Sequence, residues 1–207
     1  MAQQTPDTAT TAWAMVGDRL VFLDVAGDRY FCLGEDDNHR FAADVASGQV
    51  PDSFQPEHLV RPADWRTPCR TSPAMEAGMF RLEEVARALW LQRRAEKRLA
   101  TEGFGSALGD LSEILGSMRE PCGSMTASGR ACVRGFEHAR LLRSAADRCL
   151  PRSIALTLGL ATRGIRTNLV IAVKTAPFAA HCWVQHGSDV LNDSVEEVRR
   201  YHPLLVL

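Results

Sequence analysis

Prolines cluster in one stretch of this chain and divide it into two parts that follow different patterns. Between Gly48 and Pro73 stand Pro51, Pro56, Pro62, Pro68 and Pro73. Proline fixes φ and removes a backbone donor, so such a stretch leaves room only for short helices and a connection. Charge changes across it as well: residues 1–78 carry 12 acidic and 6 basic side chains, net −6, and the remainder is net +5. We therefore predict an α+β protein with two domains, residues 1–78 and 79–207.

The part before the prolines has the composition of a small sheet. Three segments rich in strand-forming residues are separated by the tight-turn pairs Gly17-Asp18 and Gly27-Asp28. Acidic residues at 35–38 then favour the start of a helix that ends near Ser47. The predicted strands are Trp13–Val16, Leu20–Val25 and Tyr30–Leu33, and a further short helix is predicted at Gln55–Arg61.

The part after the prolines begins with helical periodicity. Apolar residues recur at Leu82, Val85, Ala86, Leu89 and Trp90, which predicts one buried helical face. Further helices are predicted from residue 104 or 106 to 115, at 134–146 and at 150–161, with Gly164 ending the last of them. Strands are predicted at 168–173, 180–184 and 189–192, and a closing helix at 195–201.

Cys149 stands where a helix is predicted to start. Proline is tolerated in the first helical turn and not deeper, so Pro151 places Cys149 at the helix N-terminus. There the unpaired backbone N–H groups and the positive end of the helix dipole stabilise a thiolate, which is the nucleophilic form. Arg148 and Arg152 add positive charge. The same N–H groups are suited to part of an oxyanion hole. Cys149 is therefore a candidate nucleophile.

A histidine and an aspartate follow at a spacing that suits a catalytic triad. His181 begins a predicted strand 32 residues after Cys149, and Asp193 ends the next strand, 12 residues after His181. Neighbouring antiparallel strands can hold these two side chains together, so that the carboxylate orients the imidazole and the other ring nitrogen faces the thiol. We predict Cys149, His181 and Asp193 as catalytic residues.

The residues around these three resemble a known family. The order Cys–His–Asp, the pattern H-x-W-V from His181 and the helix-then-sheet order resemble the transglutaminase-like branch of the papain superfamily. More narrowly, C-L-P-R-S-x-A-L from Cys149, then R-G-I, P-F-x-A-H-x-W-V and N-D are similar to the lasso-peptide maturation proteases, the B proteins that remove a leader peptide. The resemblance is most specific from Cys149 to Asp193 and covers about residues 80–207. Cys182 departs from it, since these proteins often carry a small residue there; its side chain is expected on the opposite face of the strand.

The resemblance implies a function for each part. The C-terminal part would be a cysteine peptidase with no metal or organic cofactor. The N-terminal part is similar to the winged-helix element that binds the leader of the precursor peptide as an added strand. The implied leader-binding residues are Tyr30, Phe31, Cys32 and Leu33 on the accepting edge and Glu57, His58 and Arg61 on the groove wall. A further implied partner is an asparagine-synthetase-like macrolactam cyclase.

Two other functions remain open from the sequence. The same triad serves acyl transfer, as in transglutaminases and arylamine acetyltransferases, because the acyl-enzyme step is shared. A non-catalytic leader-binding scaffold is the second alternative.

Composition argues against several other classes of protein. Nucleic-acid binding is disfavoured, because residues 1–78 are net −6 and contain no lysine. The longest apolar runs fall far short of the roughly 18–20 residues that cross a bilayer, so no membrane partner is predicted. The six cysteines show no paired spacing or metal-ligand motif, and no secretion signal precedes them. We therefore predict free thiols, no metal site and a cytoplasmic location.

Overall fold

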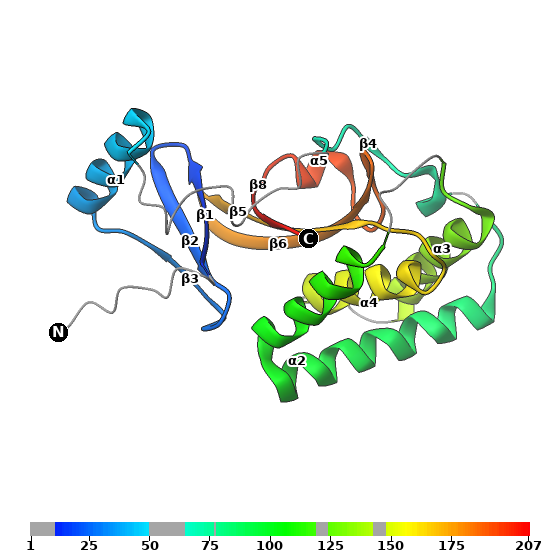
Figure 1. The fold of residues 1–207 in the computed structure, drawn as a ribbon. Coiled ribbons are helices and arrows are strands. Elements are labelled where there is room, and N and C mark those ends of the chain that lie inside the picture. The colour runs from blue at the N-terminus through cyan, green and yellow to red at the C-terminus, as the bar shows by residue number, and fades with distance from the viewer. Residues whose placement is uncertain (1–10, 50–64, 77, 119–123, 143–147) are drawn as a thin grey trace.

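In a computed structural model of the chain, the described residues form two sheets with mainly antiparallel strands and five α-helices (Figure 1). The structure describes residues 11–49, 65–76, 78–118, 124–142 and 148–207. Within these ranges a three-stranded sheet has the order β1-β2-β3, and a five-stranded sheet has the order β4-β7-β6-β5-β8. The predicted α+β class is confirmed.

The small sheet is a meander with two buried faces. Each strand pairs antiparallel with the next in sequence, and Gly17 makes the first turn with a positive φ of 66°. On one face Trp13, Phe22 and Phe31 pack with the helix α1, while Val21 and Leu23 on the other face join the main core. The elements are β1 (Thr11–Val16), β2 (Arg19–Asp24), β3 (Arg29–Cys32) and α1 (Glu35–Ser47), close to the predicted ranges.

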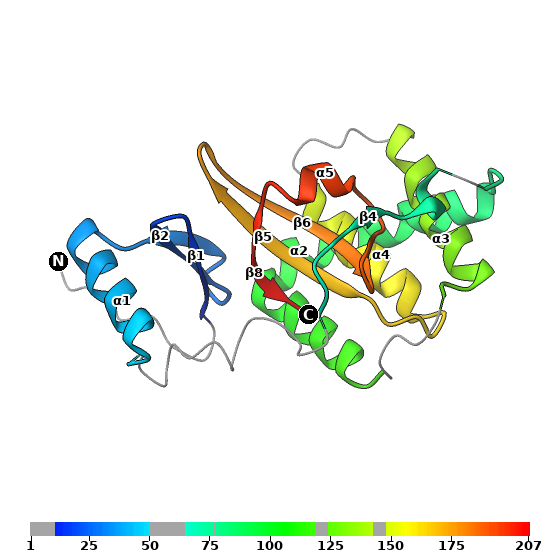
Figure 2. The ribbon, with the colours of Figure 1, turned by 90° about the horizontal axis from the view of Figure 1, so that it is seen from above.

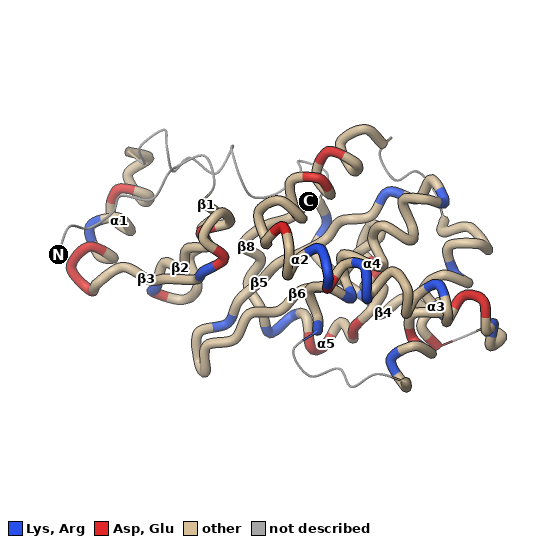
Figure 3. Tube along the Cα trace, turned by 90° about the horizontal axis from the view of Figure 1, so that it is seen from below, with Lys and Arg blue, Asp and Glu red and all other residues tan. Residues whose placement is uncertain are grey.

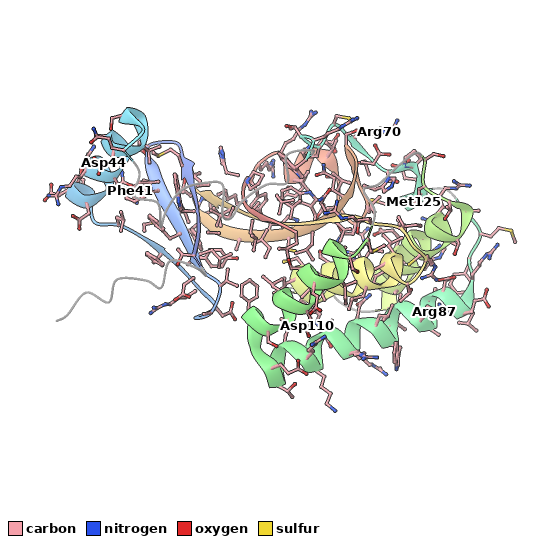
Figure 4. All side chains as sticks on the ribbon, viewed as in Figure 1. Phe41, Asp44, Arg70, Arg87, Asp110 and Met125 are labelled. Atoms are coloured by element: carbon pink, nitrogen blue, oxygen red, sulfur yellow. The ribbon has the colours of Figure 1, made fainter. Side chains whose placement is uncertain are left out.

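The large sheet is built around the long hairpin of β5 and β6. Its outer strand β4 comes from the proline-rich stretch and pairs parallel with β7, where Arg70 forms an ion pair with Asp189 across the two strands, with Nη2 and Oδ2 2.9 Å apart (Figure 4 labels Arg70). The last strand, β8, pairs antiparallel with β5 at the other edge. The bounds are β4 (Arg70–Thr71), β5 (Asn168–Thr175), β6 (Phe178–His186), β7 (Asp189–Val190) and β8 (His202–Val206).

Three helices cover one face of the large sheet and a short helix covers the other (Figure 1). The long helix α2 contains Gly103 in a non-helical conformation, φ 83° and ψ 171°. This residue divides α2 into two helical segments, as the sequence predicted. Trp183 and Val198 pack on the opposite face of the sheet. The bounds are α2 (Leu82–Gly116), α3 (Ala127–Leu142), α4 (Cys149–Ala161) and α5 (Val195–Val198).

The buried face of α2 differs from the predicted one. Trp90 is 58% exposed and Leu82 is 71% exposed, so neither belongs to the core. Val85 is buried as predicted, and the other buried positions in this half of the helix are Ala88, Gln92 and Ala95. Small residues lie where other helices come close: a Cβ on Gly135 of α3 would stand 2.7 Å from the Cβ of Glu84. The periodicity therefore predicts the helix correctly, but the face that is buried in the structure is turned about the helix axis relative to the predicted face.

Side chains from both sheets share one core, which joins the two parts of the chain. Val21 and Leu23 of the small sheet belong to the same buried cluster as Phe104 of α2, Ile171 of β5 and Leu204 of β8. Figure 2 shows the small sheet beside the β5, β6 and β8 side of the large one. The small sheet thus packs directly against the part of the structure that carries Cys149.

Several predictions about the first part concern residues that the structure leaves undescribed. The helix expected at Gln55–Arg61 lies outside the described residues, so the winged-helix arrangement stays a prediction. Residues 65–75, expected as a linker, supply β4 and a short 3-10 helix at Pro73–Met75. The division at residues 78 and 79 also stays a prediction. In the described ranges, none of the helices has the length and apolar character to cross a membrane.

Candidate active site

Cys149 is the first residue of α4, as predicted, with Arg148 as its N-cap residue and Pro151 in the first turn. The side chain is half-buried. Its sulfur accepts hydrogen bonds from the backbone N–H groups of Leu150 and Cys182. One of these donors belongs to the helix and the other to β6, so the thiol sits where α4 meets the strand.

His181 and Asp193 complete the arrangement. His181 Nε2 lies 2.8 Å from Asp193 Oδ2, and the two side chains are 16% and 29% exposed. The imidazole also hydrogen-bonds to Cys149, which leaves Nδ1 as the nitrogen that faces the thiol. Asp193 is held in turn by the Ser194 backbone N–H, which donates to Oδ1 at 2.7 Å. The structure therefore brings the three predicted residues together in the order thiol, imidazole, carboxylate.

The proton equilibria of these groups favour an ion pair. Burial raises the pKa of the Cys149 thiol, but the hydrogen bond and charge of His181 and the two N–H groups outweigh it, so its pKa lies below the ordinary value. For His181, burial lowers the pKa, whereas the bonds to Asp193 and Cys149 raise it to about 9. Burial likewise raises the pKa of Asp193, but the bonds from His181 and Ser194 hold it below its usual range. The direction of each shift favours the charged form of its group: a thiolate, an imidazolium and a carboxylate.

These shifts predict how the thiol reacts with iodoacetamide as pH changes. An ordinary thiol, with a pKa of about 8.5, is only about 0.3% ionised at pH 6. Because the pKa of Cys149 is lowered, we expect it to be alkylated at pH 6 at least about tenfold faster than the exposed Cys32 and Cys69. Peptide mass spectrometry of each cysteine at several pH values measures this ratio.

The same experiment on His181→Ala provides the control. Without the imidazole the lowering of the Cys149 pKa is reduced, so alkylation at pH 6 should slow and the curve should move toward higher pH. Equal curves for the two proteins would contradict the ion pair.

A buried polar network underlies all three candidate residues. Asn192 Oδ1 accepts from the Val184 backbone N–H at 2.8 Å, and Asn192 Nδ2 donates to Ser153 Oγ at 2.9 Å. Ser153 Oγ donates to the Cys182 carbonyl at 3.0 Å. Ser153 is one helical turn after Cys149, Asn192 precedes Asp193, and Cys182 follows His181. Sequence analysis gave Ser153 and Asn192 no role, since nothing local indicates that they meet.

The neighbouring cysteine, Cys182, does not compete with Cys149 as a nucleophile. Cys182 is only 3% exposed and belongs to the core cluster on the α4 face of the sheet, whereas His181 lies with Trp183 and Tyr201 toward the α5 face. Its placement opposite His181 is as predicted, and burial raises its pKa. In the ranges that the structure describes, no cluster of three or more His, Cys, Asp or Glu side chains could hold a metal ion.

The predicted leader-binding residues divide between two faces of an outer strand. Phe31 stacks on Phe22 at a centroid distance of 5.0 Å and, with Leu33, packs on the α1 side. Tyr30 faces the large sheet and meets Phe178, with ring centroids 5.8 Å apart. Cys32 is exposed. The remaining predicted contacts, Glu57, His58 and Arg61, lie outside the described residues.

Comparison with known proteins identifies the family. The sequence model of the transglutaminase-like superfamily matches residues 65–206, so the chain belongs to that superfamily. More particularly, a 46-residue segment is 48% identical to the microcin J25-processing protein of Escherichia coli. The matched segment covers 22% of this chain and 22% of that protein. No solved structure significantly matches this chain.

Proposed function

We propose that this protein is a cysteine peptidase that removes the leader from a ribosomally made lasso-peptide precursor. The observation that carries the proposal is Cys149 at the start of α4, held between His181 and backbone N–H groups, with Asp193 on the far side of the imidazole. The likeness to a microcin J25-processing protein supports the choice of substrate. The free thiols among the described cysteines support a reducing, cytoplasmic setting.

The chemistry follows from the positions of these groups. The Cys149 thiolate attacks the carbonyl carbon of the bond between leader and core, and the oxyanion accepts hydrogen bonds from backbone N–H groups at the α4 N-terminus. His181 gives its proton to the leaving amine, the C–N bond breaks and a thioester remains on Cys149. His181 then takes a proton from water, which attacks the thioester and releases the leader as a carboxylic acid. Asp193 orients His181 and stabilises its charged form.

The small sheet supports capture of the leader before cleavage. In the three-stranded sheet β3 is an outer strand, so its second edge is where an extended peptide would pair. Tyr30, Phe31, Cys32 and Leu33 would then alternate between the two sides of the added strand. We propose that Glu57, His58 and Arg61 line the same groove.

Mass spectrometry of a cognate precursor peptide tests the proposal. The peptide is incubated with the wild-type protein and with Cys149→Ala, with and without the asparagine-synthetase-like cyclase that we propose as a partner. We expect the wild type to cleave one bond and the variant to leave the precursor intact while still binding the leader. Because alanine has no nucleophilic atom, cleavage by both proteins would refute Cys149 as the nucleophile.

The products also decide between hydrolysis and acyl transfer. Added methylamine competes with water for the thioester, and transfer to it adds the amine to the released leader in place of a hydroxyl group. A leader that ends mainly in a free carboxylate identifies a peptidase, whereas a leader that ends mainly in the amide identifies an acyltransferase. Leader binding with no cleavage under either condition would favour the scaffold alternative.

A further inference from the structure

Two aromatic rings meet beside the candidate nucleophile, one from each sheet. Tyr30 is on β3 of the small sheet, and Phe178 begins β6 of the large one. Their ring centroids are 5.8 Å apart and their planes are inclined by 62°, an edge-to-face arrangement. Residues 148 positions apart in sequence thus form one aromatic surface where the two parts of the chain join.

This surface begins on the strand that carries His181, because Phe178 stands three residues before it on β6. Side chains alternate along a strand, so Phe178 and Cys182 share a face of β6. Tyr30, Cys149 and Leu150 all pack against the core cluster that contains Cys182. Burial raises the pKa of the Tyr30 phenol above its ordinary value, and the nearby Cys182, Asp28 and Cys149 raise it further through their charge. Tyr30 is therefore in ring contact with Phe178 and within electrostatic range of Cys149.

The rings are only partly covered. Phe178 is 52% exposed, and Tyr30 is half-buried. An aromatic ring left half-exposed beside a reactive thiol offers apolar area that a bound side chain can cover. A substrate's polar backbone would gain little from such a surface, but a large apolar or aromatic side chain would fit it.

We propose that Tyr30 and Phe178 form an aromatic subsite that binds a large apolar or aromatic side chain on the acyl side of the bond that Cys149 attacks. The choice of the acyl side rests on the proposed function, because a leader paired with β3 supplies the acyl part of the scissile bond and would reach Cys149 past Tyr30. The subsite therefore links the strand that receives the leader to the position at which the chain is cut.

Peptidyl chloromethyl ketones test the subsite without a cognate precursor. In these probes the Cys149 sulfur displaces chloride from the methylene carbon, so the rate reports where the peptide places its reactive end. The probes are N-acetyl-Gly-Gly, N-acetyl-Phe-Gly and N-acetyl-Gly-Phe chloromethyl ketone, and mass spectrometry identifies the alkylated cysteine. We expect one of the two phenylalanyl probes to react with the wild type at least about tenfold faster than the diglycyl probe, which is at the lower end of discrimination by an apolar pocket.

Substitutions in the two rings assign the preference. Tyr30→Ala and Phe178→Ala should each lower the preference for the phenylalanyl probe toward unity, whereas Tyr30→Phe, which retains the ring, should preserve it. Phe80→Ala is the matched control, since Phe80 is also an exposed aromatic residue, 61% exposed, and its ring meets that of His138. That variant should behave like the wild type. Near-ultraviolet circular dichroism checks that each variant is folded, and Phe178→Ala changes an exposed position.

The outcomes separate this inference from the proposed function. No preference in the wild type, or a preference that survives both ring deletions, overturns the subsite even if the precursor is cleaved. Iodoacetamide, which carries no side chain, measures the thiol alone, so the rate of each probe is divided by the iodoacetamide rate of the same variant. If Cys149 is inert to iodoacetamide, the nucleophile itself is wrong, and the subsite is overturned with it.

Discussion

Replacing His181 with alanine is expected to lower the rate of precursor cleavage by a factor of about 10³ or more. General acid–base catalysis by a positioned side chain is typically worth about 10²–10⁴. Here the imidazole also lowers the pKa of Cys149, so its removal leaves less thiolate as well as no acid for the leaving amine. If the leader binds at β3 as proposed, its affinity should be unchanged, since His181 lies on β6 and not on the small sheet.

The pH profile gives this prediction a second readout. In the wild type, cleavage should fall at low pH as the thiolate is protonated and again above pH about 9 as His181 loses its proton. Alkylation by iodoacetamide needs only the thiolate, so it should remain fast above pH about 9.

His186→Ala is the matched control for His181→Ala, because it removes another histidine of the same strand that pairs opposite Asp189. Its cleavage rate should stay within about twofold of the wild type. A His181→Ala protein with wild-type rate would remove His181 from the mechanism.

Replacing Asn192 with alanine is expected to lower both the stability of the fold and the reactivity of Cys149. Asn192 is 4% exposed, and its loss leaves the buried Val184 N–H without its acceptor and Ser153 without a donor. An unsatisfied buried group costs about 1–3 kcal/mol, which for a chain of this size corresponds to a fall in Tm of about 2–12 °C. Thermal unfolding measures this effect.

The network also predicts an effect on chemistry. Asn192 fixes the segment before Asp193 and, through Ser153, the turn of α4 that follows Cys149. Small displacements of catalytic groups are costly, so we expect alkylation of Cys149 at pH 6 to slow by about tenfold in Asn192→Ala.

Asn38→Ala is the matched control for this prediction. Asn38 is also buried and also bridges two backbone groups, accepting from the Leu20 N–H and donating to the Asp18 carbonyl, both at 2.8 Å. We expect a similar fall in Tm and an unchanged rate of alkylation. If both variants slow Cys149 equally, the Asn192 effect reflects only loss of stability.

The local features of the candidate site could be predicted because each has a local cause. Pro151 fixes where α4 can begin, which places Cys149 at its N-terminus. The strand that carries His181 follows from its composition, and the short return to Asp193 brings the carboxylate back to the same strand. These inferences need no knowledge of distant contacts.

Features that depend on distant contacts could not be predicted. Helical periodicity shows that α2 is amphipathic, but which side is buried depends on where α3 and α4 pack, so Trp90 was assigned to the core wrongly. The strand β4 is two residues long and forms only because β7 offers a partner. The meeting of Ser153 with Asn192 joins residues 39 positions apart.

The two parts of the chain share a core but differ in net charge, which is −6 for residues 1–78 and +5 for the remainder. The acidic residues Glu35, Asp36 and Asp37 begin α1, where they suit the positive end of the helix dipole. Figure 3 shows this acidic group at the far end of the small sheet, away from the helices that cover the large sheet. The negative charge of the first part is therefore partly explained by its favourable interaction with the dipole of α1, whose N-cap residue is Gly34 without a side-chain hydrogen bond.

The shared core between the two sheets means that the first part of the chain cannot be removed without harm to the second. Removing the residues before 65 would uncover side chains such as Phe104 and Leu204, which pack in the same cluster as Val21 and Leu23. The second part in isolation would then expose an apolar patch to water, and such patches promote aggregation. If the two parts were separate polypeptides, the same apolar patch would form the interface of a heterodimer.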